Sequence, residues 1–279
     1  MERLIRFECE PRPFVVPKRL RCHHESFPPF EVIEYRRRSK LRPYGLRMEA
    51  IVRTKVEVNE CKQAASYLAQ DLNRVWPYVA GVPLFPQILI ARRINAPPGW
   101  LSNSDTISRG LPSTLGPLRI KGGGIRFGRP KPYLVTVTEM PLGPALTAVR
   151  KFRGADQITR FLMELHFAAL NQPGTDSRLF LLAKALELVR AVLPGRNDAQ
   201  RQSALDPETR KRLRQPLHWL YGMANNRLEV RHVTERNRPQ LLQRLTKAEW
   251  HDFEQGADLV IRSVVSKRLD IELALEKDA

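Results

Sequence analysis

The sequence predicts an α+β protein, in which an N-terminal mixed α+β domain (residues 1–150) precedes a C-terminal all-α helical bundle (residues 151–279). Two observations lead to this prediction. Short β-branched runs and most of the 22 prolines lie in the first part, whereas long stretches with helical spacing follow Gly154. Residues 1–150 also hold 25 Lys/Arg and 12 Asp/Glu, a net charge of +13, against +5 in the remainder. We place the domain boundary around residues 145–156.

In the first part, residues 48–58 alternate in their second half and are rich in β-branched side chains, which predicts a strand. The spacing of apolar residues from Glu60 to Val79 then predicts a helix that Gly81 and Pro83 end. Further along, two β-branched runs predict strands, and the Pro-, Gly- and Ser-rich stretch between them predicts a loop. These segments are 87–91 and 133–138 for the strands and 95–118 for the loop.

In the second part, aspartates that precede apolar-periodic stretches predict helix N-caps, and Pro-Gly pairs predict helix ends. The predicted caps are Asp156, Asp176 and Asp206, and the predicted ends are Pro173-Gly174 and Pro194-Gly195. Pro207 suits the first position of the third helix, and Pro216 is expected to kink or split it. Four or five amphipathic helices with short links predict a compact bundle.

The last helix is predicted to start at the capping-box pattern Thr246-Lys247-Ala248-Glu249. Three histidines of this part are expected to pack rather than to act. His166 stands among apolar residues as a core or boundary residue, and His218 and His251 each stand beside a tryptophan.

The composition favours a polyanionic partner. The chain has 47 Lys/Arg against 29 Asp/Glu, a net charge of +18, which points first to nucleic acid and second to an anionic membrane. No apolar run of about 18 residues predicts a transmembrane helix, and Glu8, Glu10 and Pro11 interrupt the start before a signal-peptide core could form. Three cysteines, an odd number, fit a reducing, cytoplasmic setting.

The stretch from Trp219 to Val233 joins an apolar helical pattern to a polar, basic cluster. Within it, four residues separate Arg227 from His232. On a continuous helix this separation is about 140° of rotation, so the two side chains are not stacked, although a frayed helix end or a second subunit would bring them together. Polar groups at the end of an apolar helix need partners, which would be each other, water or a ligand.

Arg227 and His232, placed late in a basic helical pattern, resemble the Arg–His signature of HEPN domains. The surrounding residues 225–233 look most like the Apea-like HEPN and MauJ-like proteins. The resemblance covers roughly residues 155–279. It implies a four- to five-helix bundle that often forms a homodimer through the motif helices, and an RNA or nucleotide partner. Many members are metal-independent endoribonucleases, and the two-domain architecture is similar to that of bacterial defence or toxin-type proteins.

RNA cleavage without metal needs a group that moves a proton at the 2′-hydroxyl or the leaving 5′-oxygen, and histidine has a pKa near neutrality. It also needs a fixed cation for the charge of the phosphorane, which arginine offers. The resemblance therefore implies that His232 is the acid/base and Arg227 the anion clamp, with a 2′,3′-cyclic phosphate as product. Arg231 would hold a neighbouring phosphate, and Asn226 and Glu229 would orient the pair.

Three alternatives remain open at this point. Arg227 would pair with Glu229 or a helix end while His232 caps carbonyl groups, in a purely structural arrangement. Leu228 stands where active HEPN nucleases usually carry a polar residue, which favours a non-catalytic RNA- or nucleotide-binding or adaptor protein. A MauJ-like accessory factor of a metabolic cluster is the third alternative.

Two other regions invite a functional interpretation. A run of cations that could track phosphates lies between Tyr35 and Tyr44, whose rings could stack on bases, although a solvated face is the commoner explanation. Its residues are Arg36, Arg37, Arg38 and Lys40, with Arg42 beyond them. Residues 121–124, Lys-Gly-Gly-Gly, favour a hairpin turn over a P-loop, because the Gly-Lys-Ser/Thr ending is missing.

The sequence predicts neither a structural zinc site nor a cofactor. Cys9 and the Cys22-His23-His24 run suggest metal ligands, but no second cluster has zinc spacing and Cys61 stands alone. The chain also contains no G-x-S-x-G, H-E-x-x-H or G-x-G-x-x-G motif, so nothing indicates a serine hydrolase, a zinc protease or a dinucleotide-binding enzyme.

Overall fold

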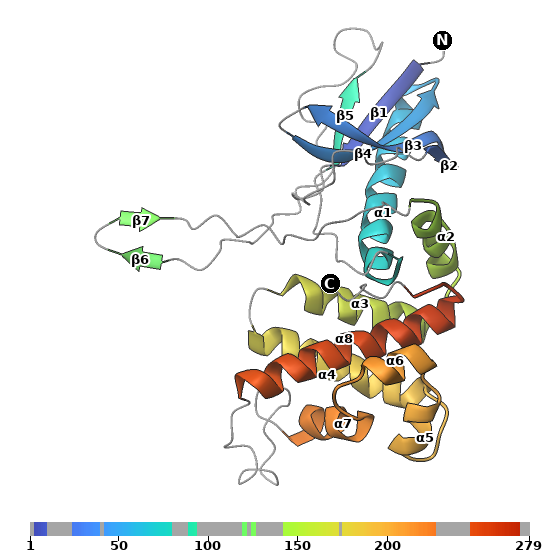
Figure 1. The fold of residues 1–279 in the computed structure, drawn as a ribbon. Helices are drawn as coiled ribbons and strands as arrows, with labels where there is room; N and C mark the ends of the chain where they lie inside the picture. The colour runs from blue at the N-terminus through green and yellow to red at the C-terminus, as the bar shows by residue number, and fades with distance from the viewer. Residues whose placement is uncertain are drawn as a thin grey trace. The chain divides into compact units, whose positions relative to one another are not determined.

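The protein is an α+β molecule, seen here in a computed structural model that describes part of the chain (Figure 1). The described residues are 3–9, 24–39, 42–79, 89–93, 119–121, 124–126, 142–172, 175–226 and 246–273. The chain divides into two compact units, Met1–Arg150 and Lys151–Ala279. Among the described residues, all strands belong to the first unit.

The first unit contains an antiparallel five-stranded sheet with the order β2-β3-β4-β1-β5. Its strands are β1 (Arg3–Cys9), β2 (His24–Phe27), β3 (Phe30–Ser39), β4 (Arg42–Val52) and β5 (Leu89–Arg93). One face forms the core, because Ile5 and Phe7 of β1 pair with Ala50 and Met48 of β4, and all four are fully buried. Helix α1 (Lys55–Val79) packs against β1, β4 and β5.

The predicted strand over residues 48–58 is wrong in its second half. β4 ends at Val52 and α1 already begins at Lys55. Thr54 Oγ1 accepts a hydrogen bond from the Glu57 backbone N–H at 3.3 Å, and the Glu57 carboxylate accepts from the backbone N–H groups of Arg53 and Thr54. This reciprocal capping outweighs the β-branched character of residues 54–58 and starts the helix.

The other predictions for the first part fall partly within the described residues. The predicted helix over 60–79 is confirmed as the main part of α1, and the predicted strand over 87–91 overlaps β5. The hairpin is confirmed, because β6 (Arg119–Lys121) and β7 (Gly124–Arg126) pair antiparallel with Lys121 opposite Gly124. The segments 95–118 and 133–138 lie outside the described residues.

Helix α2 (Leu142–Arg153) lies in a segment for which the sequence predicts only a domain boundary. Its buried side chains Leu142, Ala145, Val149 and Phe152 are three or four residues apart, the spacing of an amphipathic helix. The division between the two units falls within this helix, after Arg150. The change in composition that marks the domain boundary therefore hid helix α2 from prediction.

All elements described in the second unit beyond α2 are helices, so this part is all-α where it is described. They are α3 (Gln157–Asn171), α4 (Thr175–Val192), α5 (Asp198–Ser203), α6 (Pro207–Arg212), α7 (Leu217–Asn226) and α8 (Lys247–Leu269). In Figure 1, α8 runs between α3 on one side and α5, α6 and α7 on the other, and it contacts α3, α4, α6 and α7.

Most predicted helix boundaries are confirmed. Asp156 and Asp206 are the N-caps of α3 and α6, and Thr246 caps α8 in a complete capping box with Glu249. The proline at 216 splits the predicted third helix, since α6 ends at Arg212 and α7 starts after that proline.

One predicted cap is wrong. Helix α4 begins at Thr175, so Asp176 lies inside its first turn rather than at the N-cap. Acidic residues are favoured at both places, because the helix dipole attracts them in the first turn as the free N–H groups do at the cap. The short helix α5, which Asn197 caps, was not predicted.

Two caps with the same pattern attach other helices to α8. The N-cap Asp156 accepts hydrogen bonds from the buried Thr159 and from Arg268 Nη2 of α8 at 2.8 Å. The N-cap Asp206 likewise accepts from the buried Thr209 and from Ser263 Oγ of α8 at 2.6 Å. The caps therefore fix where α3 and α6 meet α8.

Gly222 of α7 and Gly256 of α8 should respond oppositely to alanine. A Cβ on Gly222 would meet nothing within 4 Å, so Gly222→Ala should raise the free energy of unfolding by about 1 kcal/mol through helix propensity. A Cβ on Gly256 would lie 2.9 Å from Cδ2 of the fully buried Leu220. Gly256→Ala should therefore lower that free energy by about 1 kcal/mol, because overpacking exceeds the propensity gain.

Denaturant unfolding of the two variants beside the parent protein measures both effects. Equal changes in the two variants would contradict this description of the α7–α8 contact.

Candidate functional site

Most residues of the predicted Arg–His site lie outside the described residues. The described part of α7 ends at Asn226, and Arg227, Glu229, Arg231 and His232 follow it directly in the chain. The next described helix is α8, with its N-cap at residue 246. The segment that carries the predicted site therefore connects two helices of the second unit.

The predicted phosphate-binding cations lie in the first unit. Arg36, Arg37 and Arg38 belong to β3, near its end, while Lys40 lies outside the described residues. Arg36 pairs with Gly45 and Arg37 with Tyr44 on the neighbouring strand β4. The structure thus places this run on a strand rather than in a loop.

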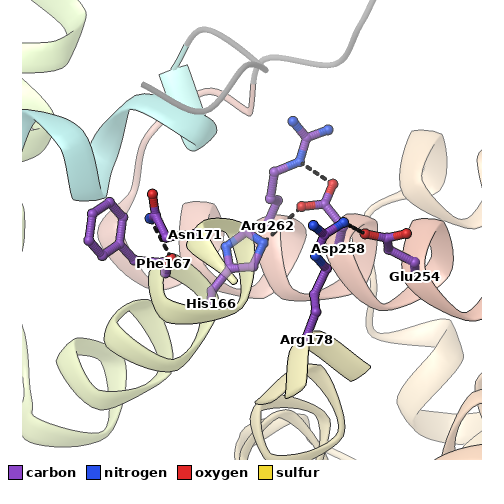
Figure 2. Close-up of polar contacts among 7 residues, drawn as sticks. All are labelled: His166, Phe167, Asn171, Arg178, Glu254, Asp258 and Arg262. Atoms are coloured by element: carbon purple, nitrogen blue, oxygen red, sulfur yellow. Dashed lines mark hydrogen bonds and ion pairs between the residues drawn. The ribbon is translucent and has the colours of Figure 1, made fainter. Parts of the chain in front are cut away.

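The described part of the second unit contains a polar cluster between α3 and α8 (Figure 2). His166 Nε2 of α3 lies 2.8 Å from Asp258 Oδ1 of α8. Arg262, one turn further along α8, places its Nε 3.3 Å from Asp258 Oδ2. Figure 2 shows the imidazole and the guanidinium approaching the carboxylate from different sides.

Electrostatics determine the proton positions in this cluster. Burial raises the pKa of Asp258, but the charge of Arg262 and the hydrogen bond and charge of His166 together lower this pKa below its ordinary value. The carboxylate is therefore ionised at neutral pH and can only accept hydrogen bonds. It follows that His166 carries a proton on Nε2 and donates it to Asp258.

Within this cluster, His166 has a structural role. The His166 side chain is 0% exposed, so no substrate can reach its ring, whereas the Asp258 side chain is 30% exposed. The expectation that His166 belongs to the core is confirmed. The expectation that His218 and His251 are packed is wrong, because both are exposed on their helices.

A second ion pair joins α8 to α4, one turn away from Asp258. Arg178 of α4 donates from Nη1 to Glu254 Oε1 at 2.6 Å and from Nη2 to the backbone carbonyl of Gln172 at 2.9 Å. Further toward the N-terminus of α8, Gln215 donates to Asp252 at 3.2 Å. Polar side chains from α3, α4 and the segment before α7 thus pair with acidic residues of α8. Sequence reasoning missed these pairs because the partners are far apart in the chain.

Helix α7, which leads into the predicted site, is held firmly in the bundle. Tyr221 is 3% exposed, and the Arg190 guanidinium of α4 lies 5.2 Å from the centre of its ring. Burial and the nearby charge of Asp198 raise the pKa of Tyr221 to about 12, against the opposing effect of Arg201 and Arg190. The phenol is therefore neutral, and the last turns of α7 have a fixed position.

Three further features of the described residues bear on function. Within them, no group of three or more His, Cys, Asp or Glu side chains could hold a metal ion. None of the helices in the described part of the chain is long and apolar enough to cross a membrane. Cys61 is buried in α1, and burial together with the charges of Glu57 and Glu60 raises the pKa of its thiol.

Comparison with known protein families, with curated proteins and with solved structures finds no match to this chain. The HEPN resemblance therefore rests on the residues of the sequence alone and remains a prediction.

The His166–Asp258 pair should make stability depend on acid pH. Because the folded pKa of Asp258 is lowered, its contribution is present above the unfolded value near 3.8 and is lost as the pH falls through the folded value. At pH 7, Asp258→Asn should lower the free energy of unfolding, since the charge that Arg262 and His166 face is removed. As the pH falls below the ordinary aspartate pKa and through the lower folded value, the parent protein and the variant should converge.

Urea unfolding of both proteins from pH 7 down to acid measures this convergence. A difference that stayed constant over the whole range would contradict the ionised state assigned to Asp258.

Proposed function

We propose that the protein acts on RNA and that its second unit is a HEPN-like bundle with metal-independent endoribonuclease activity. The observation that supports this most is the position of the Arg227–His232 element. It follows α7 without a break and precedes α8, and both helices are packed into an all-helical unit. In the chain, the element therefore lies between two packed helices, and the family signature implies a helical context of this kind.

The packing of α7 supports the proposal because it fixes the position of the backbone directly before Arg227. Leu217 and Leu220 are fully buried, and Tyr221, Met223 and Ala224 are nearly so. The helix therefore holds its end, one residue before Arg227, in a fixed place in the bundle. Catalytic groups are most effective when rigid elements carry them.

The proposed reaction is an intramolecular transesterification. His232 takes the proton of a ribose 2′-hydroxyl, whose oxygen then forms a bond to the adjacent phosphorus. Arg227 stabilises the negative charge of the phosphorane. The bond to the 5′-oxygen breaks and that oxygen receives from His232 the proton taken from the 2′-hydroxyl, which leaves a 2′,3′-cyclic phosphate, a 5′-hydroxyl and the imidazole in its starting state. No metal or redox step is needed.

The other histidines of the second unit make the test specific. His166 is enclosed and bonded to Asp258, so it cannot serve as the base. His218 and His251 are exposed on α7 and α8. They are matched controls, because each can be changed to alanine without disturbing the core.

A second function is favoured by Leu228 and by the net charge of +18. In this alternative, the protein binds RNA or a nucleotide without cutting it, as an adaptor does. It predicts saturable, salt-dependent RNA binding that His232→Ala leaves unchanged.

Purified full-length protein should cut single-stranded RNA in the presence of EDTA. His232→Ala should lower the rate by at least about a hundredfold, since general acid–base catalysis contributes about that much. Arg227→Ala should lower it by a similar factor through the loss of transition-state charge stabilisation. His251→Ala and His218→Ala should cut like the parent protein, and circular dichroism should show that all four variants are folded.

RNA that stays intact with the parent protein across varied substrates would exclude the enzymatic proposal. If such RNA is still bound in a salt-dependent way, the adaptor alternative is supported instead. Light scattering on the same samples measures whether two copies associate, as the resemblance implies.

A further inference from the structure

The β3–β4 hairpin of the first unit carries an unbroken block of positive charge. From Tyr35 to Met48 the sequence holds six cations and no acidic residue. The cations are Arg36, Arg37, Arg38, Lys40, Arg42 and Arg47. All but Lys40 lie on the two strands. Such a concentration favours a phosphate-rich partner, but charge alone does not tell which kind.

The register of the hairpin separates this block into two faces. Tyr35 pairs with Leu46, Arg37 with Tyr44, and Ser39 with Arg42. Residues opposite each other in an antiparallel ladder share a face, and successive residues of a strand alternate between faces. One face, which we term the aromatic–basic face, therefore carries Tyr35, Arg37, Arg42 and Tyr44. The opposite face carries Arg36 and Arg38.

The aromatic–basic face continues the core face of the sheet. Ile33 pairs with Met48, and both side chains are fully buried. The next rows along the same face are Tyr35–Leu46 and Arg37–Tyr44. The face thus changes from aliphatic to aromatic and cationic toward the hairpin end, and neighbouring rows lie about 6.6 Å apart, two strand residues. The buried Ile33–Met48 row therefore anchors the two rows that follow it in the same regular sheet.

We propose that the aromatic–basic face binds single-stranded RNA, with bases stacked on Tyr35 and Tyr44 and backbone phosphates paired with Arg37 and Arg42. The inference rests on the proposed RNA-directed function and adds a binding platform in the first unit, separate from the Arg227–His232 element. Aromatic side chains interleaved with cations are the recurring means of binding single strands without sequence preference.

Single strands fit this face better than other polyanions. Stacking on a side chain requires bases that are free of their own partners, which a duplex does not offer. An anionic membrane or a base-free polyanion responds to charge alone and would use both faces of the hairpin equally. Because both tyrosines belong to one face, a single strand with free bases should prefer that face, whereas the other polyanions should not.

The chain itself supplies matched variants for the test. Arg37→Ala/Arg42→Ala and Arg36→Ala/Arg38→Ala remove the same charge from opposite faces. Tyr44→Ala removes a ring from the platform, Tyr44→Phe retains it, and Tyr67→Ala removes a tyrosine that is 58% exposed on α1. Binding of labelled oligouridine, in the full-length His232→Ala background with EDTA, is measured by fluorescence anisotropy at several salt concentrations.

We expect Tyr44→Ala to weaken oligouridine binding about tenfold, and Tyr44→Phe and Tyr67→Ala to bind like the parent. Arg37→Ala/Arg42→Ala should weaken binding more than Arg36→Ala/Arg38→Ala and reduce the salt slope by about 1.4, the value for two phosphates of a single strand. Heparin, which has no bases, should bind Tyr44→Ala like the parent. Ultraviolet cross-linking of the parent protein should label residues 35–47, which tests the site without any substitution.

Equal losses for the two arginine pairs, with Tyr44→Ala unaffected, would overturn the platform and leave only general electrostatic binding. Stronger binding of duplex than of single strands, or cross-links confined to the second unit, would overturn it as well. If all hairpin variants still bind RNA like the parent protein, the aromatic–basic face is not the binding site, but the proposed RNA-directed function is retained. If the parent protein binds no RNA at all, both proposals are rejected.

Discussion

The contacts of helix α8 are the constraint on which the second unit depends. Its Asp258 holds His166 of α3, and its Glu254 holds Arg178 of α4. Its last turns carry Arg268 and Ser263, which bind the N-caps of α3 and α6. Hydrophobic burial drives the helices together, but it is non-directional, whereas these bonds specify which turn of each helix meets α8.

The same contacts remove one histidine from reach of a substrate. The histidine with the best-defined carboxylate partner, His166, is enclosed by the same contacts that orient it. Buried and already bonded, it stabilises the bundle and cannot serve a substrate. The residues that we propose for catalysis follow α7 in the chain, where a packed helix ends and polar, basic residues begin. The proposed function therefore assigns structure to the polar contacts of α8 and chemistry to the Arg227–His232 element.

Local signals in the sequence predicted the helices of the second unit well, because caps and helix-ending prolines act over three or four residues. Asp156, Asp206 and Thr246 are examples. The capping box of Thr54 and Glu57 was present in the same form, but the β-branched run around it concealed it. Strand β1 was missed although Ile5 and Phe7 alternate with charged residues. The pairing of His166 with Asp258 was beyond sequence reasoning, since 92 residues separate the two.

In the proposed reaction, an imidazole and a guanidinium cleave RNA without a metal. Mass spectrometry of the RNA ends left by the parent protein in EDTA is the decisive test, because the proposed chemistry fixes the product. We expect 2′,3′-cyclic phosphate ends together with 5′-hydroxyl ends. Ends carrying a 3′-hydroxyl and a 5′-phosphate would contradict it, since they require a water molecule rather than the ribose 2′-oxygen as the nucleophile.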